Sequence, residues 1–365
     1  MSSILPFVPS HFAAANRVQE RPSVALSLLG TGQVGGALLR QLAERGFEAP
    51  RLVGVANSRR ALSDGSGIDP GNALNRLWAE GERPGLEALV AALRQTAADV
   101  RVVVDATAAQ EVAAHHARWL ARGVHVVSAN KLAAGGGLGE WEALQAGAES
   151  GGTRYGDAAT VGAGLPALST LRRLRRAGDT LVALTGVFSG SLSFLFNAYD
   201  GTVAFSSLLA EARARGYTEP DPRADLSGRD VARKLLIVAR AAGERLEEGD
   251  IEVEDLVPAP LRELTLEAFL VRLGELDGLL ERRRYAAAAS GQVLRYVARL
   301  ERGRASVRLE ALAPDHPCAQ LSGADNLFAF TTRRYHLQPL VVRGPGAGPE
   351  ITAQALLADV LEIVA

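Results

Sequence analysis

Lysine is nearly missing from this chain of 365 residues. Of its 40 basic residues only two are lysine, Lys131 and Lys234, and all the others are arginine. Basic and acidic residues balance to a net charge of −1, and no basic tract offers the surface that nucleic-acid-binding proteins use. We therefore expect no nucleic-acid partner. Because arginine keeps its proton in proteins whereas the pKa of lysine can be shifted, the two lysines are candidates for proton transfer.

Cysteine and long apolar runs are also scarce. The single cysteine, Cys318, cannot form a disulfide within the chain and belongs to no metal-ligand spacing. No stretch approaches the roughly 20 apolar residues of a transmembrane helix, and the opening residues lack the charged region and apolar core of a signal peptide. We expect no membrane partner, a cytoplasmic location and a loose N-terminal extension over residues 1–21.

Length and hydrophobic patterning predict two domains, the first of them α/β. A strand at 24–29 leads into a glycine-rich turn and a helix, and further strands alternate with helices as far as residue 131. This alternation indicates a Rossmann-like, doubly wound parallel sheet. We assign residues 22–157 and 337–365 to this dinucleotide-binding domain, since a last strand and helix return to it.

The second predicted domain, residues 158–336, is an α+β domain for catalysis and dimerisation. Its helices are expected near residues 166–177, 206–215, 229–242 and 260–280. A hairpin of two strands, at 293–299 and 306–312, would offer a sheet edge that could pair across a two-fold axis.

A dinucleotide loop is predicted between the first strand and helix, at Gly30-x-Gly32-x-x-Gly35. Glycines at this spacing allow a sharp turn and a close approach of the backbone to a pyrophosphate. The N–H groups of Gln33 and Val34 would face that charge at the helix N-terminus. The alternative is a glycine turn that serves only helix–sheet packing.

The end of the second strand bears on the choice of cofactor. It carries Asn57-Ser58-Arg59-Arg60 and no carboxylate. Arg59 and Arg60 could bind a ribose 2′-phosphate through paired hydrogen bonds, which favours NADP and leaves NAD possible. They could also be two of the many surface arginines.

The densest group of polar residues runs from 216 to 234. Asp230 and Lys234 are four residues apart on a predicted helix and so share a face. Glu219 and Asp225 precede them and would offer carboxylates to a substrate ammonium. Alone, Asp230 and Lys234 could be an ordinary surface ion pair. The scarcity of lysine favours a chemical role, because a surface pair would accept arginine.

Several segments together resemble the homoserine dehydrogenase family. Besides the glycine loop, they are Ser128-Ala129-Asn130-Lys131, Val161-Gly162-Ala163-Gly164-Leu165-Pro166, Phe188-Ser189-Gly190-Ser191-Leu192-Ser193, the block from Tyr217 to Lys234, and Gly346-Ala347-Gly348. The resemblance runs from about Val24 to the C-terminus. It is closest to the dehydrogenase portion of fused aspartokinase–homoserine dehydrogenases.

The resemblance implies an NAD(P)-dependent homodimer that interconverts L-homoserine and L-aspartate 4-semialdehyde on the route to threonine and methionine. It implies acid–base lysines at Lys131 and Lys234, with Asp230 supporting Lys234. The remaining implied contacts are Glu219, Asp225, Tyr217, Gly190 and Ser191 with the substrate, and Thr107, Ala108, Lys131 and Gly348 with the cofactor.

The resemblance further implies a Na⁺ or K⁺ ion on the backbone carbonyls of Val161, Ala163 and Leu165. This chain departs from the family there, because Ala158 stands where relatives usually carry glutamate, with Asp157 beside it.

Two other functions stay open. A semialdehyde dehydrogenase that oxidises the aldehyde would need Cys318 as the nucleophile of a thioester. A redox-sensing NADP-binding protein would instead use its acidic loop to recognise a partner. Reduction of NADP⁺ that depends on homoserine separates the enzyme from the sensor.

Overall fold

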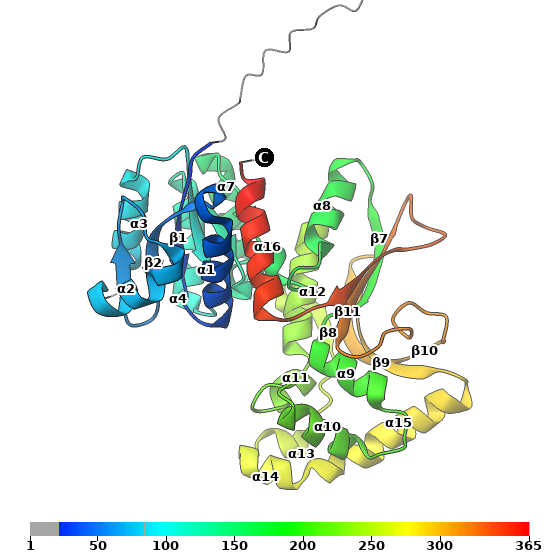
Figure 1. Cartoon of the computed structure of the whole chain (residues 1–365). Helices are drawn as coiled ribbons and strands as arrows, with labels where there is room; N and C mark the ends of the chain where they lie inside the picture. Colours follow the sequence, from blue (N-terminus) through cyan, green and yellow to red (C-terminus); the bar gives the residue numbers. More distant parts are fainter. Residues whose placement is uncertain (1–21, 84, 365) are drawn as a thin grey trace, which may run out of the picture.

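The computed structural model describes residues 22–83 and 85–364, so the predicted extension at 1–21 lies outside it. The described residues form two six-stranded sheets, each with its own set of helices (Figure 1).

The first sheet confirms the Rossmann-like prediction. Its strand order is β3-β2-β1-β4-β5-β6, and every neighbouring pair is parallel except β2 with β3. The strands are β1 Val24–Leu29, β2 Arg51–Ala56, β3 Ala61–Ser63, β4 Val100–Asp105, β5 His125–Ser128 and β6 Tyr155–Gly156.

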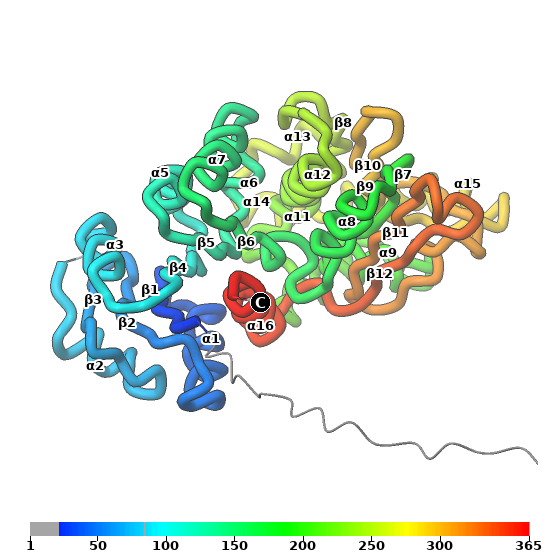
Figure 2. The backbone as a smooth tube through the Cα atoms, turned by 90° about the horizontal axis from the view of Figure 1, so that it is seen from above, coloured from blue at the N-terminus to red at the C-terminus, as the bar shows by residue number. Residues whose placement is uncertain are grey.

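Helices cover both faces of this sheet, as a doubly wound fold requires. One face packs against α1, α2 and the C-terminal α16, and the other against α3, α5 and α7. Figure 2 shows α16 beside α1, although the two lie at opposite ends of the chain. The helices are α1 Gln33–Arg45, α2 Ala73–Glu80, α3 Leu86–Gln95, α4 Gln110–Ala113, α5 His116–Ala121, α6 Lys131–Ala134, α7 Leu138–Gly151 and α16 Pro349–Glu362.

The second sheet has the order β12-β11-β7-β9-β10-β8 and is antiparallel except where β8 pairs with β10. Its strands are β7 Leu181–Val187, β8 Ile251–Val253, β9 Val293–Glu301, β10 Arg304–Leu312, β11 Asp325–Thr332 and β12 Leu340–Pro345. Helices join it into one large core. They are α8 Ala167–Arg176, α9 Gly190–Ala198, α10 Phe205–Ala214, α11 Arg223–Leu226, α12 Arg229–Ala242, α13 Ala259–Arg262, α14 Leu266–Val271 and α15 Asp277–Ala289.

The prediction of one helix over 260–280 was wrong, because α13, α14, the 3-10 helix Leu273–Leu276 and α15 divide this segment. The Thr265 hydroxyl accepts a hydrogen bond from the Ala268 N–H and so starts α14 as a new helix. Arg272 has a non-helical φ of −102° and ends it. Within the described part of the chain, no helix is long and apolar enough to cross a membrane.

Two expectations about the second sheet also need correction. Residues 340–345 form β12 of this sheet, so the part of 337–365 that packs on the first sheet is α16. The β9–β10 hairpin does not provide a free edge. β9 lies between β7 and β10, and β8 covers part of the outer side of β10 at Ala305–Val307. The sheet edges are β12 and β8.

Candidate active site

The predicted glycine loop joins β1 to α1. Gly30 has a positive φ of 95°, and a Cβ there would come within 2.6 Å of the Ala106 carbonyl oxygen. A Cβ at Gly35 would lie 1.9 Å from the Gly30 oxygen, so both positions require glycine. At Gly32, in contrast, a Cβ would have no described atom within 4 Å, and no described side chain caps α1. Open space beside uncapped N–H groups fits a dinucleotide pyrophosphate.

The two arginines after β2 differ in their surroundings. The Asn57 side chain fixes the turn, since its Oδ1 accepts hydrogen bonds from the N–H groups of Arg59 and Arg60. The Arg60 guanidinium lies 5.0 Å from the Trp78 ring centroid and donates to the Gly81 carbonyl. Arg59 is exposed. Arg59 is therefore the better placed of the two to meet a phosphate.

A cavity of about 750 Å³ brings most of the remaining predicted residues together. The domain of the first sheet contributes to its wall Val34, Thr107, Ala108 and Lys131. The domain of the second sheet contributes Gly190, Ser191, Tyr217, Glu219, Asp225, Asp230 and Lys234. The connection to α16 contributes Gly346, Ala347 and Gly348. Of the glycine loop, Val34 alone is part of this wall, whereas Gln33 begins α1.

Asp230 lies between the two lysines of the chain. Its Oδ2 is 2.8 Å from Lys234 Nζ, one turn along α12, and its Oδ1 is 3.2 Å from Lys131 Nζ at the start of α6. Lys234 Nζ also donates to the Phe188 carbonyl at 2.8 Å. The Lys234 side chain is 12% exposed and that of Lys131 34%, so the ammonium of Lys234 is the more enclosed.

This arrangement shifts the pKa values of two groups. Desolvation would raise the pKa of Asp230, but the charges of Lys234 and Lys131 outweigh it and hold that pKa well below its ordinary value. Desolvation lowers the pKa of Lys234, and the charge of Lys131 lowers it further, although Asp230 acts in the opposite direction. Lys234 therefore releases its proton more readily than an exposed lysine.

The acidic loop before α12 holds a second carboxylate at the cavity. Asp225 Oδ1 accepts a hydrogen bond from the Ser191 hydroxyl at 2.6 Å, and its Oδ2 accepts from the Glu219 N–H at 2.9 Å. Desolvation raises the pKa of Asp225, and these hydrogen bonds oppose the rise. Tyr217 packs against the Phe194 ring with centroids 4.7 Å apart. The loop is thus fixed with Asp225 and Glu219 at the wall.

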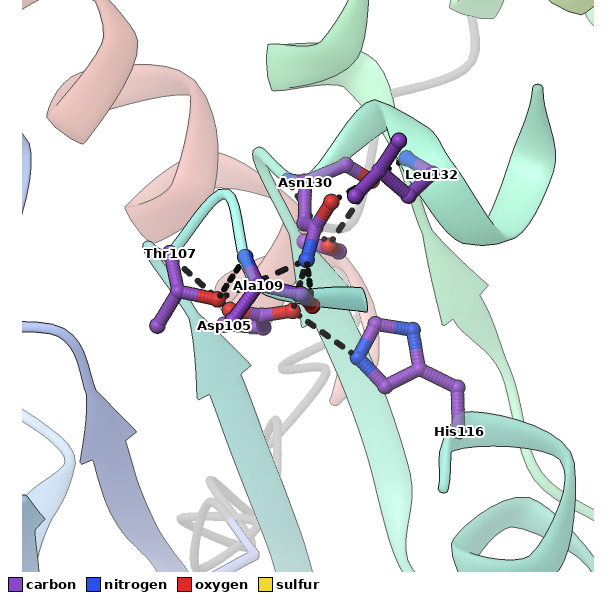
Figure 3. A network of polar contacts seen from close by, with 7 residues as sticks. Asp105, Thr107, Ala109, His116, Asn130 and Leu132 are labelled. Carbon is purple, nitrogen blue, oxygen red and sulfur yellow. Dashed lines mark hydrogen bonds and ion pairs between the residues drawn. The ribbon is translucent and has the colours of Figure 1, made fainter. Parts of the chain in front are cut away.

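A buried polar network lies behind the cavity wall (Figure 3). Asp105, at the end of β4, accepts hydrogen bonds from the Thr107 N–H and from Asn130 Nδ2. Its Oδ2 also lies 3.0 Å from His116 Nε2. Sequence reasoning assigned no role to Asp105, His116 or Asn130. One signal was present, since an aspartate that ends a buried strand lies at the edge where α/β sites form.

The monovalent-cation site at the carbonyls of Val161, Ala163 and Leu165 stays a prediction. Leu165 already accepts a hydrogen bond from the Ala167 N–H at 2.8 Å, and Val161 is fully buried. Asp157 is held by the Arg172 guanidinium through two hydrogen bonds of 2.6 and 2.7 Å. Its charge is therefore neutralised by arginine. The described residues also contain no group of three acidic, histidine or cysteine side chains placed to hold a metal ion.

Cys318 is not placed for thioester chemistry. Its side chain is fully buried among Val187, Val297 and Leu327, and it does not line the cavity. Burial raises the pKa of its thiol to about 12, so the reactive thiolate is not available. This arrangement argues against the semialdehyde dehydrogenase alternative.

Comparison with known proteins gives matches to two family models. The model for homoserine dehydrogenase matches residues 166–361, and the model for the homoserine dehydrogenase NAD binding domain matches residues 30–156. The chain is 37% identical over 362 residues to a homoserine dehydrogenase of Emericella nidulans, covering 93% of this chain and 98% of the relative.

Two further proteins are similar over most of the chain. The chloroplastic bifunctional aspartokinase/homoserine dehydrogenase 2 of Zea mays is 43% identical over 354 residues, 94% of this chain. The chain spans 39% of that relative's length. A Candida auris protein of unknown function has a crystal structure with a TM-score of 0.88 and 34% identity, covering 94% of this chain and 98% of that one. Together with the family models and the fungal relative, these matches show that the chain belongs to the homoserine dehydrogenase family.

Proposed function

We propose that this chain catalyses the reversible NADP-dependent interconversion of L-homoserine and L-aspartate 4-semialdehyde, a step toward threonine and methionine. One observation carries the proposal. The carboxylate of Asp230 holds Lys131 and Lys234 together at the wall of a cavity that both parts of the fold share. A proton-transfer pair beside a dinucleotide loop suits the oxidation of an alcohol.

The acidic loop would bind the substrate. Glu219 and Asp225 present carboxylates to the ammonium group of the amino acid, and Ser191 keeps Asp225 in place through its 2.6 Å hydrogen bond. Tyr217 and the backbone of Gly190 would close the same side of the cavity. This orientation directs the hydroxyl end of homoserine toward the lysines.

The lysines would move the proton. A bound nicotinamide supplies the hydride acceptor, and the glycine loop fits its pyrophosphate while Thr107, Ala108 and Gly348 offer the wall for its ring. Lys234, with its lowered pKa, accepts the hydroxyl proton during oxidation and returns it during reduction. The ion pairs with Asp230 fix both ammonium groups, so that Lys131 would lie beside the developing alkoxide.

The preference for NADP would depend on Arg59. Its exposed guanidinium follows β2, where no carboxylate competes for the ribose hydroxyls, and Arg60 is engaged by Trp78 and Gly81. Replacing Arg59 by alanine should raise KM for NADP⁺ roughly tenfold and leave KM for NAD⁺ little changed. Equal effects on both cofactors would contradict this assignment.

We also propose that the enzyme is a cytoplasmic homodimer, and that the backbone carbonyls of Val161, Ala163 and Leu165 offer a site for Na⁺ or K⁺. The edge strand β12 of the second sheet supports the dimer, because its outer side has no partner strand among the described residues and an edge strand can pair with a second copy. Val341 on this strand is 40% exposed. A free, buried Cys318 accords with a reducing compartment. Sedimentation should give twice 38.4 kDa, and the reaction rate should respond to added NaCl or KCl, whereas a flat response would argue for a lost cation site.

Steady-state kinetics with homoserine and both cofactors tests the proposal. The expected result is reduction of NADP⁺ that depends on homoserine and is faster at alkaline pH. If no NADP⁺ is reduced with homoserine at neutral or alkaline pH, a cofactor-binding sensor is favoured instead.

A further inference from the structure

Asp105 and His116 form a buried polar pair that is not part of the wall of the active-site cavity. Both side chains are fully buried, with His116 Nε2 3.0 Å from Asp105 Oδ2. The histidine ring packs between the rings of Trp119 and Tyr155, each with its centroid 5.8 Å away (Figure 3 shows His116 and Asp105). The pair therefore contacts neither substrate nor cofactor directly.

The hydrogen bonds around Asp105 indicate which ring nitrogen of His116 carries the hydrogen that is donated to the carboxylate. Asp105 accepts from the Thr107 N–H and from Asn130 Nδ2, so it acts as an acceptor at both oxygens. The hydrogen on the ring must then lie on Nε2, which donates to Asp105. The other ring nitrogen, Nδ1, has no hydrogen-bond partner among the described residues.

Asn130 connects this pair to the active site. Its Nδ2 donates to Asp105 and to the Ala109 carbonyl at 3.0 Å each, and its Oδ1 accepts from the Leu132 N–H as the cap of α6. Lys131 is the first residue of that helix and reaches Asp230. The direction of the Lys131 side chain is therefore set by an amide that Asp105 holds.

We propose that His116 is a positioning residue for the reaction, acting through Asp105 and Asn130 to hold Lys131 and the turn at Thr107 in their working geometry. The proposal rests on the proposed function and adds a residue to it. His116 provides the third hydrogen bond to a fully buried carboxylate, which would otherwise be free to rotate. That rotation would release Asn130 or Thr107.

The consequence for the reaction is specific. Displacement of Lys131 removes an interaction made with the developing charge and leaves substrate binding by the acidic loop unchanged, so kcat falls while KM stays. The groups that face Lys234 are Asp230, Asp225 and Lys131. Since the charge of Lys131 lowers the pKa of Lys234, its displacement moves the alkaline rise in the rate to higher pH.

The experiment compares purified full-length variants in homoserine oxidation. His116→Phe keeps an aromatic ring and removes the donor, whereas His116→Gln restores an N–H. His115→Phe is the matched control, because His115 neighbours it in sequence, stacks on Trp119 and contacts Glu87 instead. We expect His116→Phe to lower kcat about tenfold with KM for homoserine within twofold and the pH profile moved upward, His116→Gln to recover most of the rate, and His115→Phe to match the wild type.

Asn130→Ser provides a second test, because serine retains a helix cap but loses the tether to Asp105. If His116→Phe does not fold, the kcat and pH profile of Asn130→Ser test whether this network positions Lys131. Folded His116→Phe and Asn130→Ser proteins with wild-type kcat and pH profile would overturn the proposal, even if their melting temperatures fell. An inactive wild type would instead overturn the proposed function, and this inference with it.

Discussion

Among single residues, Lys131 and Lys234 are the best candidates for moving the proton in the proposed reaction. In a chain that otherwise uses arginine, both lysines contact one carboxylate, Asp230. Arginine cannot release a proton at working pH, whereas an enclosed lysine can. The composition therefore has a chemical explanation at Lys131 and Lys234.

The pH dependence of the reaction should follow Lys234. Oxidation needs this side chain neutral, and its pKa lies below the ordinary value of 10.5 because desolvation disfavours its charged form. The rate of homoserine oxidation should therefore rise with pH and reach half of its maximum below pH 10.5, while semialdehyde reduction declines over the same range. Initial rates in both directions measure this. An oxidation rate that falls with rising pH would contradict the role given to Lys234.

Asp359 on α16 should make stability depend on pH. Desolvation, and then the charge of Asp157, raise its pKa to about 7 in the folded chain, against an ordinary value of 3.8. The folded state therefore holds a proton that the unfolded state has lost, and stability falls as pH rises from about 4 to 7. Asp359→Asn should raise Tm by about 2 °C at pH 8 and have little effect at pH 4. Equal Tm values of the variant and the wild type at pH 8 would contradict the raised pKa of the Asp359 carboxyl.

In the glycine loop between β1 and α1, some glycines are required for packing, whereas Gly32 leaves space for a ligand. Gly30 and Gly35 are required by close contacts, but a Cβ at Gly32 meets open space on a backbone with φ −74°. Gly32→Ala should therefore leave Tm unchanged and raise KM for NADP⁺ roughly tenfold, because the methyl group occupies the approach to the N–H groups. Gly36→Ala, one turn along α1, is the matched control and should bind normally. Unchanged cofactor affinity in Gly32→Ala would place the pyrophosphate elsewhere.

Elements with strong local signals could be predicted from the sequence. The strand before Gly30 and the helix carrying Asp230 and Lys234 were predicted within a residue or two, because apolar runs and glycine turns mark them. The segment 260–280 was not, because its apolar residues continue past the break at Thr265. β12 was assigned to the wrong sheet, since sequence pattern does not specify strand partners.

In the candidate active site, too, contacts within one helix could be predicted from the sequence, whereas contacts between distant segments could not. Asp230 with Lys234 could be predicted because they are one helical turn apart, whereas the contact of Lys131 with Asp230 joins segments far apart in the chain. The pair of Asp105 and His116 has no sequence spacing that would reveal it. Contacts that depend on how two elements pack were the part that sequence alone did not supply.

In the whole molecule, the cavity is lined by residues from the domains of both sheets. The domain of the first sheet provides Thr107 and Lys131, and that of the second provides Asp225, Asp230 and Lys234. After β12 of the second sheet, α16 packs against the first sheet. The two lysines thus come from different domains and meet at Asp230. The central claim is that both are needed for proton transfer.

Homoserine-dependent reduction of NADP⁺ by Lys131→Arg and Lys234→Arg tests that claim most directly. Each variant keeps a positive charge beside Asp230, and Arg229→Lys on the exposed side of α12 is the control. With folding verified by Tm, kcat should fall by about 10²-fold or more for Lys234→Arg and markedly for Lys131→Arg, while the control keeps its rate. Near-normal turnover in both lysine variants would contradict the account.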